Sequence, residues 1–430
     1  VTGTDNPVQI TVDNPREVTA VFEKKSFGIT ITKNGEGSVV LNPDQQEFLY
    51  NSTVELEANP AHGWSFVEWQ GDVSGTDTLL TVTVDTAKTI TAVFESPFAG
   101  GTGTEANPFQ ISTIEQLQAM NNYEYDSDYF VQINDIDASA TAGGNGGIEF
   151  TPIMSFRGSY DGQEYAISNF TINSTSEFVG LFGWVSEGAK ISNVKLVDVD
   201  ITGGNSTGSL IGHNLGEISN SSATGTIHCL DERCGGLIAT NRGSIENSFA
   251  DVNVSSNSKY VGGLVGLNRN EIVTSYARGD VSGTTNVGGL AGGTDDNGES
   301  AYPYRIFRSY AQGSVTGEDK VGGLIGIQFD GSYISSAYAT GKVTLTSGSN
   351  TYIGGLVGRY NYSSGTFVEY CYWDKENSGQ NEAVLGGDSN VTGLTTSQMT
   401  GANAATNMPD WDFVNIWQTV SGDYPALFWE

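Results

Sequence analysis

The stretch Gly262-Gly263-Leu264-Val265-Gly266 decides the fold of this chain, because close variants of it recur before and after it. The variants are Gly208–Gly212, Gly235–Ala239, Gly288–Gly292, Gly322–Gly326 and Gly354–Gly358. From Leu181 to Leu290 the matching leucines lie roughly 26 to 29 residues apart, and the intervals to Leu324 and Leu356 are longer. Repeats of this length are typical of solenoids, in which each unit stacks on its neighbours.

The repeats predict an all-β parallel β-solenoid, or β-helix, with three short strands per coil. In one coil these are the glycine stretch at 262–266, the stretch Ile272–Ala277 and the stretch Gly279–Gly283. Strands this short suit a coil that hydrogen-bonds to its neighbours about 4.8 Å above and below. We expect Leu264 and Val281 to face inward, and the glycines to permit tight corners.

A separate small β-module is predicted at residues 25–97. Segments such as Ile29–Thr32 and Leu80–Val84 alternate apolar with polar residues, which is the period of half-buried strands. Its closing stretch, Lys88–Glu95, is nearly repeated at Glu17–Lys24. We therefore expect residues 1–24 to be the tail of a truncated earlier copy.

This module resembles the divergent internalin-type B-repeat of bacterial surface proteins. The resemblance rests on Gly35–Val39, on Ala58–Trp69 and on Thr91–Phe94. Such modules usually act as spacers, so the resemblance implies no catalytic residue. His62 lies beside a glycine with no second ligand type nearby, which favours a structural role in a turn.

Residues 98–122 read as a linker and an N-terminal capping helix. The segment Ile114–Met120 has helical spacing after Ser112 or Thr113 as an N-cap. The solenoid then occupies residues 123–376, and residues 377–430 form a C-terminal capping segment. Caps are expected because the end coils of a solenoid expose unpaired edges.

From about residue 100 onward the chain resembles the GLUG-motif family. Beyond the repeats, the match includes Asn134–Asp137, Phe156–Gly162, Cys371–Asp374, Trp411–Phe413 and Tyr424–Leu427. The resemblance implies a parallel β-solenoid. It also implies an exported bacterial protein, often adhesin-like or of unknown activity and sometimes beside an enzyme, and it supplies no catalytic residues.

Composition limits the classes of partner and the cellular compartment that we expect for this chain. The formal net charge of -31 repels phosphate backbones and anionic headgroups, so nucleic acid is not an expected partner. No stretch approaches the roughly 20 consecutive apolar residues of a membrane helix. The N-terminus shows no export signal, and we expect one outside this sequence, in a longer exported chain that is extracellular or bound to the cell surface.

The cysteines are compatible with that compartment. Cys229 and Cys234 flank a short loop and could form a disulfide, or they could be two small buried thiols. Cys371, between two tyrosines, reads as a buried small hydrophobe.

The candidate binding strip follows the glycine phrases. Arginines there stand out against an acidic average, and guanidinium forks bind carboxylate or sulfate bidentately. Tyrosines would offer flat faces to sugar rings. The strip comprises Arg242, Arg269, Tyr302, Tyr304, Arg305, Asp330, Arg359 and Tyr360. The asparagines beside it, such as Asn241 and Asn268, have a simpler interpretation as solvated corners that bond to their own backbone.

A catalytic alternative centres on the longest insertion. Asp295, Asp296 or Glu299 could act as acid and base in glycoside hydrolysis, with Arg269 and Arg305 holding an anionic subsite. The same carboxylates could bind Ca²⁺, although the stretch lacks the EF-hand spacing, or form a solvated loop. No other cofactor or metal is expected, since His213 and His228 should lie roughly 16 Å apart.

Two functions remain open from the sequence. The favoured one is an adhesin-like surface protein that binds a glycan or another cell through one edge of the solenoid. The alternative is a glycoside hydrolase or polysaccharide lyase acting on an acidic polysaccharide in a groove along the solenoid.

Overall fold

The computed structural model describes residues 4–122, 126–143, 149–294, 304–329, 331–346, 352–361, 367–384 and 390–430. The chain forms two compact units, Val1–Ser96 and Pro97–Glu430.

The N-terminal unit is a small β-module around one apolar core. Its strands are β1 (Ser26–Phe27) with β4 (Phe48–Leu49), then β2 (Ile29–Asn34), β8 (Lys88–Glu95) and β6 (Ser65–Gly71), and β3 (Gly37–Asn42), β5 (Ser52–Pro60) and β7 (Leu79–Val84). Trp69, Leu56 and Phe94 are buried together in the core. The predicted β-module is confirmed. Residues 4–25 contain no strand, and Phe22 there is 88% exposed.

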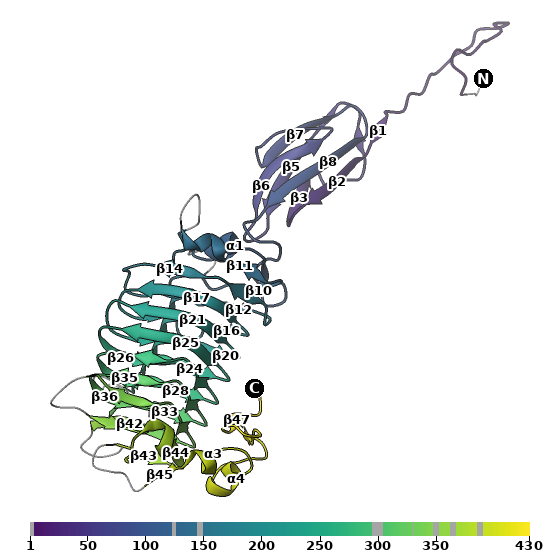
Figure 1. Cartoon of the computed structure of the whole chain (residues 1–430). Helices are drawn as coiled ribbons and strands as arrows, with labels where there is room; N and C mark the ends of the chain where they lie inside the picture. The colour runs from purple at the N-terminus through teal and green to yellow at the C-terminus, as the bar shows by residue number, and fades with distance from the viewer. Residues whose placement is uncertain are drawn as a thin grey trace. The chain divides into compact units, whose positions relative to one another are not determined.

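The second unit is a parallel β-solenoid, as predicted, with four sheets that run along its length (Figure 1). We number the sheets in the order in which a regular coil passes through them. Sheet 1 contains β18 (Thr207–Gly208), β22 (Cys234–Gly235), β26 (Lys259–Gly262), β31 (Thr285–Gly288), β36 (Asp319–Gly322) and β41 (Ile353–Gly354). Sheet 2 contains β15 (Phe182–Val185), β19 (Ile211–Asn214), β23 (Ile238–Asn241), β27 (Val265–Asn268), β32 (Ala291–Gly293), β37 (Ile325–Phe329) and β42 (Val357–Asn361).

The other two sheets begin in the earlier, irregular coils. Sheet 3 contains β9 (Phe109–Ile111), β10 (Tyr129–Gln132), β12 (Ser159–Asp161), β16 (Lys190–Ser192), β20 (Glu217–Ser219), β24 (Ser244–Glu246), β28 (Glu271–Val273), β33 (Tyr304–Phe307), β38 (Ser332–Ser335) and β43 (Phe367–Glu369). Sheet 4 contains β11 (Ile136–Asp137), β13 (Ala166–Ser168), β14 (Thr171–Asn173), β17 (Lys195–Gly203), β21 (Ser222–Cys229), β25 (Phe249–Ser256), β29 (Tyr276–Ala277), β30 (Val281–Ser282), β34 (Tyr310–Ala311), β35 (Val315–Gly317), β39 (Tyr338–Ala339), β40 (Val343–Leu345), β44 (Cys371–Asp374) and β45 (Val391–Leu394).

The coil differs from the prediction in its number of strands. The glycine phrase bends at Gly263 and Leu264, so it supplies the end of β26 in sheet 1 and the start of β27 in sheet 2. The stretch Ile272–Ala277 is likewise shared between sheets 3 and 4. Each coil therefore passes through four sheets, where three strands were predicted, because the glycine phrase and the stretch Ile272–Ala277 each turn a corner in the middle.

The glycines at this bend also allow close approach between coils. A Cβ at Gly263 would lie 2.2 Å from the carbonyl oxygen of Gly289 in the next coil. The corners with left-handed backbone are formed by residues with side chains, including Arg233, Tyr260 and Asn286 with φ of 63°, 61° and 57°. Such residues adopt this region at a cost, so the stacked coils must hold them there.

The apolar core follows the predicted pattern. Leu264 and Val281 are buried in one continuous apolar core. The helix α1 (Ile114–Ala119) begins at Thr113, whose side chain accepts a hydrogen bond from the Gln116 amide, and buries Ile114 and Leu117 in that core.

The C-terminal segment lies against the outer surface of sheet 4. Its remaining elements are α2 (Lys375–Ser378), α3 (Thr396–Met399), α4 (Asn403–Asn407), β46 (Trp417–Gln418) and β47 (Ala426–Leu427). Trp411 and Trp417 pack on a stacked row of tyrosines from successive coils, which includes Tyr310 and Tyr338. The segment therefore covers one side of the solenoid near its last coils.

We predict that Gly263→Ala destabilises the solenoid by more than about 3 kcal/mol, because the added methyl group meets backbone that cannot move aside. Chemical denaturation of the purified chain, followed by circular dichroism, measures this loss. Unchanged stability would show that the coils are farther apart than the structure places them.

Candidate functional site

A row of outward-facing side chains on sheet 2 forms the base of the candidate site. Trp184, His213, Thr240 and Leu267 occupy the same register position in four successive coils. The rings of Trp184 and His213 stack 4.1 Å apart, with 8° between their planes. Phe178 packs edge-on against both rings.

Side chains from the left-handed positions where the chain enters sheet 1 cover part of this row. Tyr260 packs on Leu267 and Ile327 in a small cluster outside the main core. Gly293 makes room for it, since a Cβ there would lie 3.0 Å from the Tyr260 ring. The unusual backbone at these positions thus directs side chains such as Tyr260 over the outer surface of sheet 2.

The corner between sheets 2 and 3 contains a buried ladder of asparagines. The Asn214 amide donates to Asn241 Oδ1 at 2.9 Å, and the Asn241 amide donates to Asn268 Oδ1 at 2.8 Å. The Asn241 oxygen also accepts from the Gly243 backbone amide at 3.2 Å. The expected bonds to local backbone are present, but the corner is not solvated, because all three side chains are fully buried.

We predict that Asn241→Leu lowers the free energy of unfolding by about 2–4 kcal/mol, because it removes the buried bonds to both neighbouring asparagines and to Gly243, and leaves the Asn214 amide with the Gly216 carbonyl alone. Denaturant unfolding provides the measurement. Asn257→Leu, at an exposed turn position, is the control and should change stability little. Equal effects of the two substitutions would contradict a structural role for the ladder.

Three arginines surround His213, and we call Arg233, Arg242 and Arg269 the basic face. Arg242 and Arg269 follow the asparagine ladder in successive coils, where their backbone amides donate to Asn214 and Asn241 carbonyls at 2.7 Å. Arg242 is exposed, and it forms no ion pair with any described residue. Arg233 and Arg269 are half-buried.

The basic face changes the ionisation of His213. Burial is the largest cause that lowers the pKa of His213, from 6.5 to about 4, and the positive charges of Arg242, Arg269 and Arg233 lower it further. His213 is therefore neutral at pH 7 and adds no positive charge of its own. Beside the arginines, the neutral imidazole of His213 stacks on Trp184.

We predict that protonation of His213 destabilises the fold. Its pKa is lower in the folded state, so its stabilising effect is complete above pH 6.5 and is lost as the pH falls toward 4, by about 2–3 kcal/mol in total. His213→Phe should remove this part of the pH dependence while other groups still titrate. Unfolding measured from pH 7 to pH 4 in both proteins gives the difference, and His62→Phe in the separate N-terminal unit is the control. Parallel curves for the parent and His213→Phe would contradict the prediction.

The predicted strip is only partly assembled. Arg305 lies on sheet 3 one coil beyond Arg269, with its guanidinium 3.9 Å from the Glu271 carboxylate. Arg359 is on sheet 2, three coils beyond Leu267, and lies 4.4 Å from the centre of the Tyr352 ring. The basic face thus gains Arg233, which the strip did not include, and does not contain Arg359.

Two predicted tyrosine platforms are not exposed. Tyr304 is 4% exposed, and Tyr360 packs against the main core at the register position of the asparagine ladder. Tyr304 therefore presents no flat face to a ligand, and Tyr360 is partly buried. Asp295, Asp296, Glu299, Tyr302 and Asp330 lie outside the described residues.

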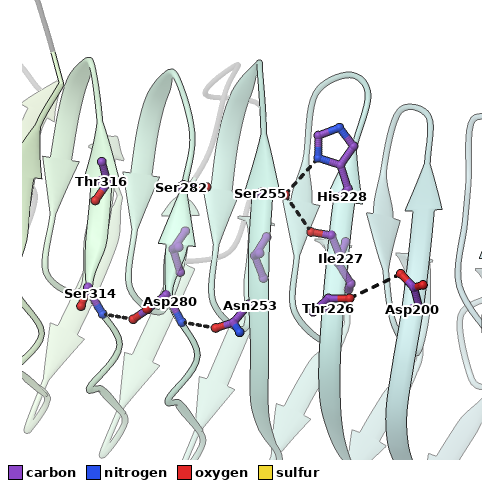
Figure 2. A pocket seen from close by; sticks show the side chains of 12 residues that line it. Asp200, Thr226, Ile227, His228, Asn253, Ser255, Asp280, Ser282, Ser314 and Thr316 are labelled. Carbon is purple, nitrogen blue, oxygen red and sulfur yellow. Dashed lines mark hydrogen bonds between the residues drawn. The ribbon is translucent and has the colours of Figure 1, made fainter. Parts of the chain in front are cut away.

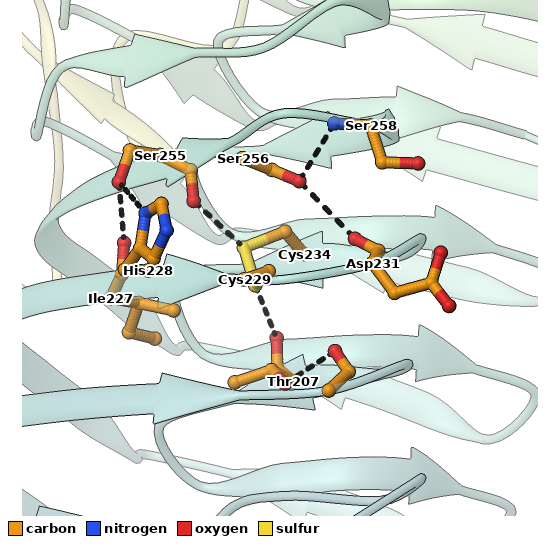
Figure 3. Close-up of a disulfide and its surroundings, with 10 residues drawn as sticks. Thr207, Ile227, His228, Cys229, Asp231, Cys234, Ser255, Ser256 and Ser258 are labelled. Atoms are coloured by element: carbon orange, nitrogen blue, oxygen red, sulfur yellow. Dashed lines mark hydrogen bonds between the residues drawn. A yellow bond between two sulfur atoms is a disulfide. The ribbon is translucent and has the colours of Figure 1, made fainter. Parts of the chain in front are cut away.

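The structure joins Cys229 and Cys234 in a disulfide at the corner between sheets 4 and 1 (Figure 3). The crosslink closes the loop that carries Arg233 in its left-handed conformation. It therefore lies next to the basic face and restricts the backbone that positions one of the arginines. Cys371 is buried and free, as expected from its neighbours.

A polar groove of about 430 Å³, which the sequence did not indicate, runs along the outer surface of sheet 4 (Figure 2). Short polar side chains line it in two rows, and bonds such as His228 Nδ1 to Ser255 Oγ at 3.0 Å link adjacent coils. Asp200 and Asp280 are three coils apart, or about 14 Å. This exceeds the roughly 5–9.5 Å needed for a glycosidase acid and base pair.

The described residues lack the features of a metal site and of a membrane-spanning helix. They contain no group of three or more His, Cys, Asp or Glu side chains suited to a metal ion. No helix among them is long and apolar enough to cross a bilayer.

Comparison with known families agrees with the two-unit fold. Residues 27–97 match the divergent InlB B-repeat domain, and residues 203–227 match the GLUG motif. The chain carries a B-repeat and a GLUG motif. The GLUG match covers the coil that contains His213. This chain is therefore a β-solenoid repeat protein with a B-repeat module before the solenoid.

Similar proteins extend the comparison. Halomucin of Haloquadratum walsbyi is 36% identical over 342 residues, which is 79% of this chain but 3% of halomucin. A Gly-rich protein of Evansella cellulosilytica, provisionally named a membrane protein, is 36% identical over 135 residues, or 30% of this chain and 16% of that protein. This chain therefore spans only a small part of either relative.

A solved structure shares the fold. It is a Bacteroides ovatus protein whose assignment as an immunoglobulin A1 protease is provisional. The TM-score is 0.53 at 21% identity, with 78% of this chain and 96% of that chain covered. At this identity the likeness concerns the fold alone.

Proposed function

We propose that this chain is part of an exported surface protein, adhesin-like, whose solenoid binds an acidic glycan at the basic face. The observation that carries the proposal is that Arg242 and Arg269 follow the asparagine ladder in successive coils beside His213, whose pKa they and Arg233 lower, in a chain with net charge -31. Scattered surface charge would not be expected to gather cations in this way. A surface location is supported by the relative named as a membrane protein, by halomucin and by the B-repeat module.

The chemistry of the basic face suits sulfate or carboxylate groups. Arginine offers a planar fork of donors that matches these anions in bidentate geometry. Arg242 and Arg269 occupy successive coils, so their guanidinium groups can be spaced by about 4.8 Å, the distance between strands. A polymer with one anionic group per sugar could engage both at once.

The catalytic alternative gains no support from the described residues. Its acid and base candidates, Asp295, Asp296 and Glu299, lie outside them. Among the described carboxylates of the polar groove, Asp200 and Asp280 are too far apart to act as a pair. Binding is therefore the function that the described geometry supports better.

We predict that Arg242→Ala weakens binding of a sulfated or carboxylated oligosaccharide by about 1.5–3 kcal/mol while stability stays nearly unchanged, because an exposed charge-assisted bond is lost. Arg269→Lys, which keeps the charge and removes the fork, should also weaken binding. A glycan array followed by calorimetry measures both. Arg157→Ala, 58% exposed and paired with Asp126 elsewhere, is the control and should bind like the parent.

His213 reports on the location of the ligand. An anion bound among the three arginines offsets their charge, so the pKa of His213 should rise in the complex. Nuclear magnetic resonance of the imidazole ring follows this pKa with and without ligand. Binding that leaves the His213 pKa unchanged, or that is insensitive to salt, would place the ligand elsewhere.

A further inference from the structure

A second cavity, of about 420 Å³, lies at the corner between sheets 3 and 4. Its walls come from the coils around Asn193, Asn220 and Asn247 and from the last two residues, Trp429 and Glu430. A cavity of this size falls in the range of small-molecule sites. It does not share lining residues with the basic face.

One wall is the uncovered end of an aromatic row. Phe249, Tyr276, Tyr310 and Tyr338 stack on successive coils at 4.7–4.8 Å, with nearly parallel rings. Trp429 lies against Phe249 and Tyr276 at 6.3 and 5.6 Å between ring centres, and its indole NH donates to the Thr274 carbonyl at 2.9 Å. The indole is still 37% exposed.

Beyond Phe249 the same row continues with polar residues. Ser222 and Lys195 occupy the next two coils at the register position of Phe249. Their side chains make no hydrogen bond or ion pair with any described residue. The aromatic wall therefore adjoins a hydroxyl group and an ammonium group that are available to a ligand.

A second row of polar groups lines the corner. Glu164, Asn193, Asn220 and Asn247 share one register position and all have left-handed backbone, with φ between 48° and 61°. Asn193 donates to Asp161, and Asn247 accepts from Thr274, but the Asn220 amide has no partner among the described residues. An amide both donates and accepts, as neighbouring hydroxyl groups of a sugar do.

We propose that this cavity binds a neutral sugar residue, with one ring face against Trp429 and Phe249 and its hydroxyl groups on Asn220 and Ser222. Aromatic faces and amide side chains together suit a ring with one apolar face and polar edges. The Lys195 and Glu164 charges balance each other, and Arg278 pairs with Glu430 at 2.5 Å. The cavity therefore has no excess charge with which to select an acidic sugar.

The test titrates the whole chain with glucose, galactose, xylose, N-acetylglucosamine and cellobiose at millimolar concentrations. The Trp429 indole resonance, assigned through Trp429→Phe, is the reporter. At least one of these sugars should shift it, and Asn220→Ala should weaken that binding about three- to tenfold through a lost hydrogen bond. Phe428→Ala, beside Trp429 but outside the cavity, is the matched control and should bind like the parent.

Further variants separate this site from the basic face. Binding here should be unchanged in Arg242→Ala and insensitive to salt, whereas binding at the basic face should depend on both. Because Asn220 has a left-handed backbone that alanine disfavours, denaturant unfolding of Asn220→Ala and binding by Asn220→Asp, which keeps the backbone preference, separate lost binding from misfolding. The proposal fails if no neutral sugar shifts Trp429, if Asn220→Ala binds as well as the parent, or if only glucuronate binds and Lys195→Ala abolishes it.

Discussion

The rest of the structure depends on the close approach of one coil to the next at the second glycine of each phrase. At Gly263 the backbone lies so near the carbonyl of Gly289 that no side chain fits between them. This contact keeps the coils in register, so that Leu264, Leu290 and Leu324 bury the same core position along the solenoid. The solenoid is held by hydrogen bonds between neighbouring coils, and a separation too large at this point would weaken all four sheets together.

The same register also determines how side chains are arranged on the outer surface of the solenoid. Because every coil repeats its backbone, each outer position becomes a column of side chains about 4.8 Å apart. Columns of asparagine, tyrosine and arginine then arise from residues 26 to 34 positions apart in the sequence, such as Tyr276 and Tyr310. The strained corner of Arg233 and Tyr260 adds side chains that lie over sheet 2. A ligand site on this protein is therefore formed by side chains from two neighbouring columns.

The sequence predicted the solenoid, the B-repeat, the capping helix and the inward leucines, because these depend on repeated residue types. It did not predict four sheets, since the bend at Gly263 and Leu264 falls inside a continuous apolar phrase. Tyr360 was assigned to the surface because it follows a glycine phrase, yet its register matches the buried Asn214 column. The stack of Trp184 on His213 could have been found by aligning the two phrases at Leu181 and Leu210. The left-handed backbone of Arg233 could not, because local preference disfavours it.

The net negative charge of the chain repels a polyanionic ligand, whereas the basic face attracts it. At physiological ionic strength charges are screened over about 8 Å, so a glycan feels little of the net charge until it is close to the surface. Near the surface, only cations that are not already paired with carboxylates can attract it. Arg242 meets this condition among the described residues, whereas Arg305 faces Glu271 and Lys259 pairs with Glu232. The ion pairs that each cation forms therefore decide where an anion can bind on this chain. Because His213 is neutral, the positive charge of the basic face comes from its arginines.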